Sequence, residues 1–175
     1  RDYSIPWPVS PGCPASTLRC IPCLVGTDSR CRVETGETHG FIGWSCQNNN
    51  PGNIRPDPNS FRNSLIVAMG GTASCGKRVG TGGEYMVFSD YNTGFNSLKA
   101  YLRAINAGMH STYTNCGDCT LRFFAQTYST NYDTYANNLG NYLGVNPDTT
   151  TLRTLVENRL DDLARGIQHV EGFFT

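Results

Sequence analysis

A carboxyl group that could donate a proton stands close to the end of the sequence, at Glu171. Apolar residues recur with helical spacing up to Val170 and predict that this glutamate ends the last helix. The negative pole of the helix dipole and apolar neighbours on both sides disfavour a charged carboxylate, so we expect a raised pKa. A carboxyl group that keeps its proton near neutral pH could protonate the leaving oxygen of a glycosidic bond. The alternative is an ordinary exposed glutamate at a fraying terminus.

Other carboxylates compete for a catalytic role. Glu34 and Glu37 lie in a polar loop, residues 33–40. Either could be the second carboxylate of a glycosidase pair, or the acid itself. The alternative is a solvated loop, where lone charges usually lie. Weaker candidates of the same kind are Asp57, Glu84 and Asp90.

Residues 47–55 form the densest polar stretch, with five side-chain amides and one guanidinium around Pro51-Gly52. Pro-Gly fits the central positions of a type II turn. Paired donors and acceptors on such a turn could grip sugar hydroxyls and acetamido groups. The alternative is a surface loop whose asparagines bond their own backbone. The residues that we assign to sugar binding are Asn49, Asn50, Asn53 and Arg55.

Three aromatic residues, Trp44, Tyr85 and Tyr91, could stack on sugar rings, because the face of a pyranose is flat and apolar. Core packing is the alternative for each of them. The three histidines have no ligand-like spacing with one another or with the cysteines. We therefore expect neither a metal ion nor a cofactor.

The chain carries eight cysteines in a setting rich in glycine, threonine and asparagine. An even number of this size favours disulfide bonds and an oxidising compartment, so we expect a secreted, extracellular protein. A four-thiolate zinc site built from Cys20-x-x-Cys23 and Cys116-x-x-Cys119 is the alternative.

Composition narrows the choice of partners. Fourteen basic residues balance 14 acidic ones without a run of like charge, which argues against nucleic acid and an anionic membrane surface. No apolar stretch approaches the roughly 20 residues of a membrane span, and the N-terminus does not resemble a signal peptide, which favours a mature chain. We expect one monomeric domain over residues 1–175, with residues 1–46 as a Cys/Pro-rich N-terminal collar.

The pattern of elements changes along the chain. Strands are predicted at residues 65–69 and 84–88, each ended by glycine or polar turn residues. Apolar spacings of three and four then predict four helices. Asn92 is the expected N-cap of the first helix, and Gly144 the end of the third. The predicted class is α+β, with a small irregular sheet region followed by a helical half. The four helices are expected over residues 95–109, 121–128, 132–143 and 152–170.

Residues 48–55, Asn-Asn-Asn-Pro-Gly-Asn-Ile-Arg, resemble the signature of a phage- and prophage-associated family of small lysozyme-like virion proteins. The resemblance continues in Met86–Asp90, in Tyr132–Ala136 and in Leu163–Gly172, where that family carries a matching glutamate. It covers roughly residues 47–172 and is specific in the first octet, looser elsewhere. The segment ending in Glu171-Gly172 is also similar to the helix that opens phage-type lysozymes.

The resemblance implies a lysozyme-like, circularly permuted, disulfide-stabilised fold with Glu171 as general acid. The implied activity is that of a muramidase, which cleaves between N-acetylmuramic acid and N-acetylglucosamine in bacterial peptidoglycan; a secreted fungal muramidase is one form this could take. Residues 1–46 have no counterpart in the phage family, and Phe123–Ala125 replace an expected tryptophan. Two alternatives remain: a non-catalytic peptidoglycan- or chitin-binding module, and a structural or effector protein that acts on other proteins.

Overall fold

The computed structural model describes residues 5–6, 19–20, 49–55, 64–71, 76–80, 83–88, 90–113 and 116–171. Glu34, Glu37, Trp44 and Asp57 lie outside these ranges, as does most of the predicted collar. The predictions for these residues are therefore neither confirmed nor contradicted.

The described part of the chain is mostly helical and contains two small antiparallel sheets of two strands each. Strand β1 (Ile5–Pro6) pairs with β2 (Arg19–Cys20), and β3 (Gly76–Gly80) pairs with β4 (Gly83–Val87). In the second sheet Arg78 lies opposite Tyr85. The predicted order of a sheet region followed by a helical half is confirmed in part: five described helices follow the strands, but one short helix lies between the two sheets in the sequence. The helices are α2 (Ser64–Ala68), α3 (Tyr91–Asn106), α4 (Leu121–Tyr128), α5 (Tyr132–Leu143), α6 (Leu152–Asn158) and α7 (Leu160–Val170).

The two predicted strands have different outcomes. Residues 84–88 coincide with β4, so that prediction is confirmed. The prediction at residues 65–69 is wrong, because this segment forms helix α2. Ile66 is fully buried while Val67 is 50% exposed, so one side of a short helix packs on α3. A five-residue apolar run carries too little periodicity to separate a strand from a helix.

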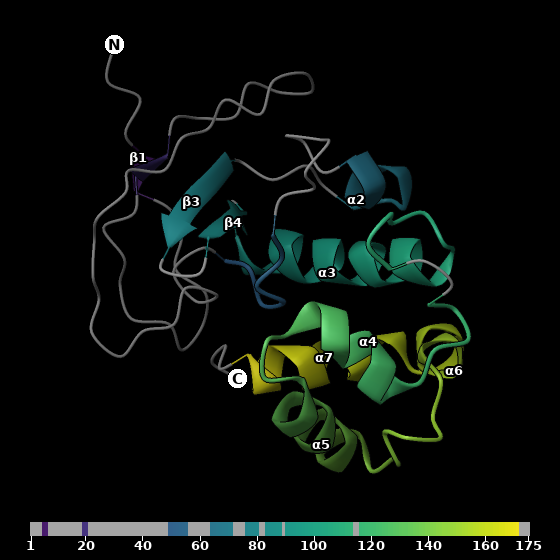
Figure 1. Ribbon diagram of the computed structural model, residues 1–175. Coiled ribbons are helices and arrows are strands. Elements are labelled where there is room, and N and C mark those ends of the chain that lie inside the picture. Colours follow the sequence, from purple (N-terminus) through teal and green to yellow (C-terminus); the bar gives the residue numbers. More distant parts are fainter. Residues whose placement is uncertain are drawn as a thin grey trace.

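Helix α3 confirms the first predicted helix and crosses the middle of the molecule, between α2 and the group α4–α7 (Figure 1). Its buried face includes Leu98, Leu102 and Ile105. The prediction of Asn92 as the N-cap is wrong, because the N-cap lies two residues earlier. Asp90 is the N-cap, and its carboxylate accepts a hydrogen bond of 2.8 Å from the backbone N–H of Thr93.

Helices α4 and α5 begin and end where the sequence predicts, and Gly144 closes α5 in the left-handed conformation with φ of 69°. The single helix predicted over residues 152–170 is wrong, because Arg159 divides it into α6 and α7. Arg159 has the non-helical angles φ −144° and ψ 44°. Its guanidinium donates to the carbonyl of Leu143 at 3.0 Å, so a tertiary contact stabilises the break. α6 packs on α3, and α7 packs on α5 and α3.

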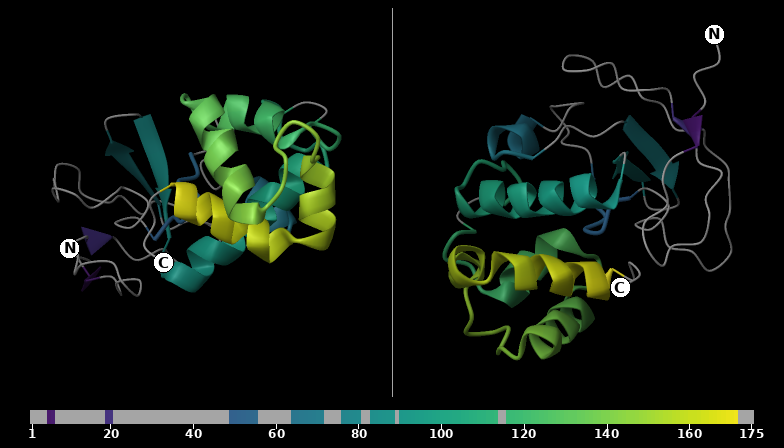
Figure 2. Two further views of the ribbon diagram at one scale, coloured as in Figure 1. Left: turned by 90° about the horizontal axis from the view of Figure 1, so that it is seen from below. Right: turned by 180° about the vertical axis from the view of Figure 1, so that it is seen from behind.

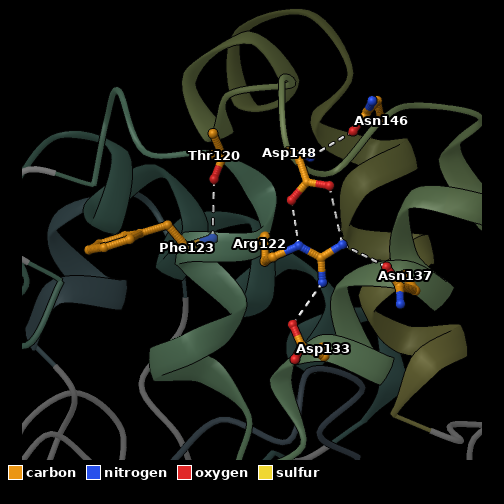
Figure 3. A network of polar contacts seen from close by, with 7 residues as sticks. All are labelled: Thr120, Arg122, Phe123, Asp133, Asn137, Asn146 and Asp148. Atoms are coloured by element: carbon orange, nitrogen blue, oxygen red, sulfur yellow. Dashed lines mark hydrogen bonds and ion pairs between the residues drawn. The ribbon is translucent and has the colours of Figure 1, made fainter.

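A polar network on the surface joins α4, α5 and the loop before α6 (Figure 3). Arg122 donates to Asp148 at 2.5 Å, to Asp133 at 2.9 Å and to Asn137 at 2.7 Å. The two carboxylates are mostly exposed. This surface network links α4, α5 and the loop before α6.

The last turn of α7 ends near the segment 49–55 in both views of Figure 2. Three segments far apart in the sequence thus lie close together: the amide-rich turn, the C-terminal end of α4 and the C-terminal end of α7. The candidate site lies where they meet.

Candidate functional site

The amide-rich stretch forms a tight turn, closed by a hydrogen bond of 2.9 Å from the Asn53 N–H to the Asn50 carbonyl. The predicted type II geometry is wrong, because Gly52 does not have the positive φ that this type requires. Positive φ falls instead on Asn49 and Asn53, both at 50°. Gly52 is needed for space, since a Cβ there would clash with Leu98 of α3.

Asn49 and Asn50 are buried, with 3% and 0% of their surface exposed. The Asn50 side chain donates to the carbonyls of Ile54 and Met86 at 2.9 and 3.0 Å and accepts from the Ile54 N–H at 2.9 Å. The Asn49 amide donates to the Phe88 carbonyl at 3.2 Å. These two amides fasten the turn to β4 and the residue after it. The structure therefore does not bring them to the cleft, and backbone bonding replaces the sugar contact expected of them.

Asn53 and Arg55, in the second half of the turn, do reach a cleft of about 420 Å³. The cleft opens between the turn, β4, α3, the end of α4 and the end of α7. Hydroxyl and amide groups dominate its wall. Its lining residues are Asn53, Ile54, Arg55, Tyr85, Tyr101, Tyr113, Gln126, Thr127, Tyr128, Ser129, Thr130 and Glu171.

Glu171 is the C-cap of α7, and its backbone N–H donates to the Ile167 carbonyl at 2.9 Å. Burial raises the pKa of its carboxyl group from 4.5 to about 7. Hydrogen bonding from Tyr135 and Asn53, and the positive charge of Arg55, lower the pKa but do not cancel the effect of burial. The predicted rise is found, with desolvation as its main cause. Near neutral pH this carboxyl group can hold a proton and release it.

Two buried polar atoms lie next to this carboxyl group. Among the described residues the Tyr135 hydroxyl makes no hydrogen bond of ordinary geometry, so its contact with Glu171 is a loose one. The Asn53 Oδ1 atom is also buried without a hydrogen-bond partner in the described part of the chain. Burial raises the pKa of the Tyr135 hydroxyl well above 10, so it stays neutral and can act as a donor. A site with unsatisfied polar atoms beside a proton donor has room for a polar ligand to complete it.

A row of tyrosines and one histidine forms the wall behind the cleft. His110 is buried and accepts from the Thr112 N–H at Nδ1 (3.1 Å), so the neutral ring carries its proton on Nε2. Nε2 lies 3.0 Å from the Tyr101 hydroxyl. Burial, together with a hydrogen bond to Tyr101, raises the pKa of Tyr113. Tyr128 donates to the Gly52 carbonyl and ties this wall to the amide-rich turn. Burial also raises the pKa of Tyr128, so the hydroxyls of Tyr113 and Tyr128 stay neutral.

Arg55 and Tyr85 form the opposite edge of the cleft. The Arg55 guanidinium carbon lies 5.2 Å from the centroid of the Tyr85 ring, and Nη2 lies 3.4 Å from the Tyr85 hydroxyl. Arg55 is exposed, whereas Tyr85 is only 8% exposed. The aromatic ring therefore supports a cation that remains accessible to a ligand.

Other predicted residues lie away from the cleft. Tyr91 donates to Gln168 Oε1 at 2.7 Å and stacks on Phe95 with ring centroids 5.7 Å apart, so it joins α3 to α7. Asp90 caps α3. Glu84 belongs to strand β4. Among the described residues, Glu171 is the one acidic side chain that lines the cleft.

Most of the tyrosines in the cleft and the segment 126–130 were not predicted from the sequence. Tyr128 fits the apolar stripe of α4, and a tyrosine in such a stripe is read as core. The chemistry of tyrosine could have identified these residues, because a buried tyrosine hydroxyl needs a polar partner. Several tyrosines on the core faces of helices therefore indicate a polar cavity.

Cys116 and Cys119 form a disulfide bond with their Cα atoms 4.6 Å apart. This finding overturns the zinc alternative, because cysteines in a disulfide cannot supply thiolate ligands. No cluster of three or more His, Cys, Asp or Glu side chains suited to a metal ion occurs within the described ranges. Nor is any described helix both long and apolar enough to span a membrane.

Comparison with known proteins adds no assignment: no family model matches the chain, and no curated protein matches its sequence.

Proposed function

We propose that this protein is a peptidoglycan hydrolase, a glycoside hydrolase of the lysozyme or muramidase type that cleaves the bond between N-acetylmuramic acid and N-acetylglucosamine. The observation that carries the proposal is the Glu171 carboxyl group, whose pKa is raised to about 7 by burial in a cleft of hydroxyl and amide groups. Glycoside hydrolysis requires an acid of this kind next to the scissile bond.

The neighbours of Glu171 suit both halves of a proton transfer. Burial keeps the carboxyl group neutral before the transfer. After the transfer the carboxylate is negative, and the groups that lower its pKa, namely Tyr135, Asn53 and Arg55, are those that stabilise this charge. The same cleft thus provides a proton donor and partial support for its conjugate base.

The second carboxylate of the pair comes from outside the described part of the chain in this proposal, with Glu37 and Glu34 as candidates. In an inverting enzyme it would activate water, and in a retaining enzyme it would attack the sugar. The separation of the two carboxyl groups decides between these outcomes.

The resemblance of residues 47–172 to the phage lysozyme-like family supports the same activity. The expected substrate is the glycan strand of bacterial peptidoglycan, met outside the cell by a secreted protein. In the circularly permuted fold that the resemblance implies, the last helix would carry the catalytic acid. Helix α7 ends at Glu171, which lines the cleft.

The test is loss of turbidity of a bacterial cell-wall suspension with the wild type and with Glu171→Gln. The amide keeps the shape of the side chain but cannot donate a carboxyl proton, so we expect the rate to fall by about 10²-fold or more. Glu157→Gln is the matched control, because Glu157 is exposed on α6, away from the cleft. Full activity in Glu171→Gln would transfer the acid to Glu37 or Glu34. Cell-wall binding without hydrolysis by the wild type would support the binding module instead.

A further inference from the structure

The cleft carries one fixed positive charge. Besides Glu171, its lining side chains are hydroxyl, amide, aromatic or aliphatic groups, and Arg55 is the sole cation among them in the described part of the chain. The ion pairs found among the described residues join Lys99, Arg122, Arg153 and Arg159 to aspartates, and none of them includes Arg55. The charge of Arg55 is thus available to a ligand.

Tyr85 holds this guanidinium at the edge of the cleft. The ring lies 5.2 Å from the guanidinium carbon, and its hydroxyl lies 3.4 Å from Nη2. These contacts occupy one face and one N–H, while the remaining donors of the guanidinium keep the fork geometry that matches a carboxylate. An arginine supported on one side, and without an ion-pair partner among the described residues, is suited to bind an anion.

The two sugars of peptidoglycan differ at one position. N-acetylmuramic acid carries a lactyl group on O3, which ends in a carboxylate or continues as a peptide stem that bears carboxylates. N-acetylglucosamine has a neutral hydroxyl group there. A cation beside the acid that cleaves the glycan could separate these two sugars.

We propose that Arg55 binds a carboxylate on the O3 substituent of the muramyl sugar, and so makes the cleft select peptidoglycan over chitin. This inference rests on the proposed muramidase function, and it identifies the O3 carboxylate as the part of the substrate that the site recognises. The affinity for a charged muramyl glycan depends on Arg55, and the affinity for a neutral glucosamine glycan does not.

The experiment measures dissociation constants by calorimetry in the Glu171→Gln background, which prevents hydrolysis. Four tetrasaccharide probes are compared: N-acetylglucosamine tetramer, the alternating muramyl glycan with free lactyl carboxylates, the same glycan with these groups converted to amides, and the same glycan with peptide stems. Arg55→Gln should weaken binding of the free-carboxylate glycan by about tenfold or more, since a charge-assisted hydrogen bond is lost. Binding of the tetramer and of the amidated glycan should stay unchanged.

Arg55→Lys is the matched variant, because it keeps the charge and loses the fork. We expect it to retain part of the preference, and the preference of the parent protein should shrink at high salt. The stem-bearing glycan separates two sources of the carboxylate, since its lactyl groups are already amides. If its binding also depends on Arg55, the stem supplies the anion; if not, the lactyl group does.

Equal weakening of the charged and neutral glycans by Arg55→Gln would overturn the inference and make Arg55 a general part of the wall. An unchanged preference would overturn it as well. In both cases hydrolysis of cell walls by the wild type would leave the proposed function intact. If the wild type neither hydrolyses cell walls nor binds any of the four probes, the proposed function fails and this inference fails with it.

Discussion

Two groups of charged side chains in this molecule show opposite responses to their surroundings. At the surface, Asp148 pairs with Arg122, and hydrogen bonding to the guanidinium lowers the pKa of the carboxyl group (Figure 3). At the end of α7, burial raises the pKa of Glu171 to about 7, although Arg55 acts in the other direction. Pairing dominates where water is present, and desolvation dominates where it is excluded. A carboxyl group becomes a proton donor near neutral pH only in the second setting.

The largest expected effect concerns the pH dependence of hydrolysis. Only the protonated Glu171 can act as the acid, so the rate should decline above the pKa of about 7, reaching a fall of about tenfold per pH unit. Initial rates on a cell-wall suspension between pH 5 and 9, at constant ionic strength, measure this decline. The stability of the protein is measured at each pH as a control. A rate that keeps rising to pH 9 would contradict the role of Glu171 as acid.

The second effect is on stability and needs no substrate. The pKa of the Glu171 carboxyl group is about 7 in the folded protein, against an ordinary value of 4.5. Since the folded value is higher, the group destabilises the fold progressively as pH rises through this window, and fully above it. Replacement by Gln should therefore raise the free energy of unfolding at pH 8 by about 3 kcal/mol at most, and by little at pH 4. Urea denaturation at both pH values tests this, with Glu157→Gln as the variant that should change neither.

A third, smaller effect concerns the buried contact between Tyr101 and His110. Tyr101→Phe leaves the His110 Nε2–H without the hydroxyl that lies 3.0 Å away. The free energy of unfolding should fall by about 1–2 kcal/mol, because a buried donor loses its partner. Tyr142→Phe, at an exposed tyrosine of α5, should change it very little. Equal results for both variants would show that the His110–Tyr101 contact does not stabilise the fold.

The smallest effect is expected at the surface network. Asp148→Asn should lower the melting temperature slightly at neutral pH, because the ionised carboxylate loses its pairing with Arg122. The folded pKa of Asp148 is lowered, so its contribution is present above the unfolded value and is lost as pH falls through the folded one. This direction is opposite to that of Glu171. High salt should abolish the difference between wild type and variant, and persistence in 1 M salt would contradict it.

The local pattern of the sequence determined most of the helical half. Apolar spacings of three and four identified α3, α4 and α5, and Gly144 marked the end of α5. The position of Glu171 after an amphipathic helix also predicted the direction of its pKa shift. These features depend on neighbours within one or two turns of the chain, which a single sequence displays directly.

The tertiary structure alone decided which polar residues face the cleft. Asn50 and Asn53 have the same side chain and lie in one turn, yet Asn50 bonds β4 and Asn53 lines the cleft. The gathering of Tyr101, Tyr113 and Tyr128 around Glu171 joins segments up to 70 positions apart. Packing of α3, α4 and α7 against the turn sets these positions, and no local spacing encodes such long-range packing.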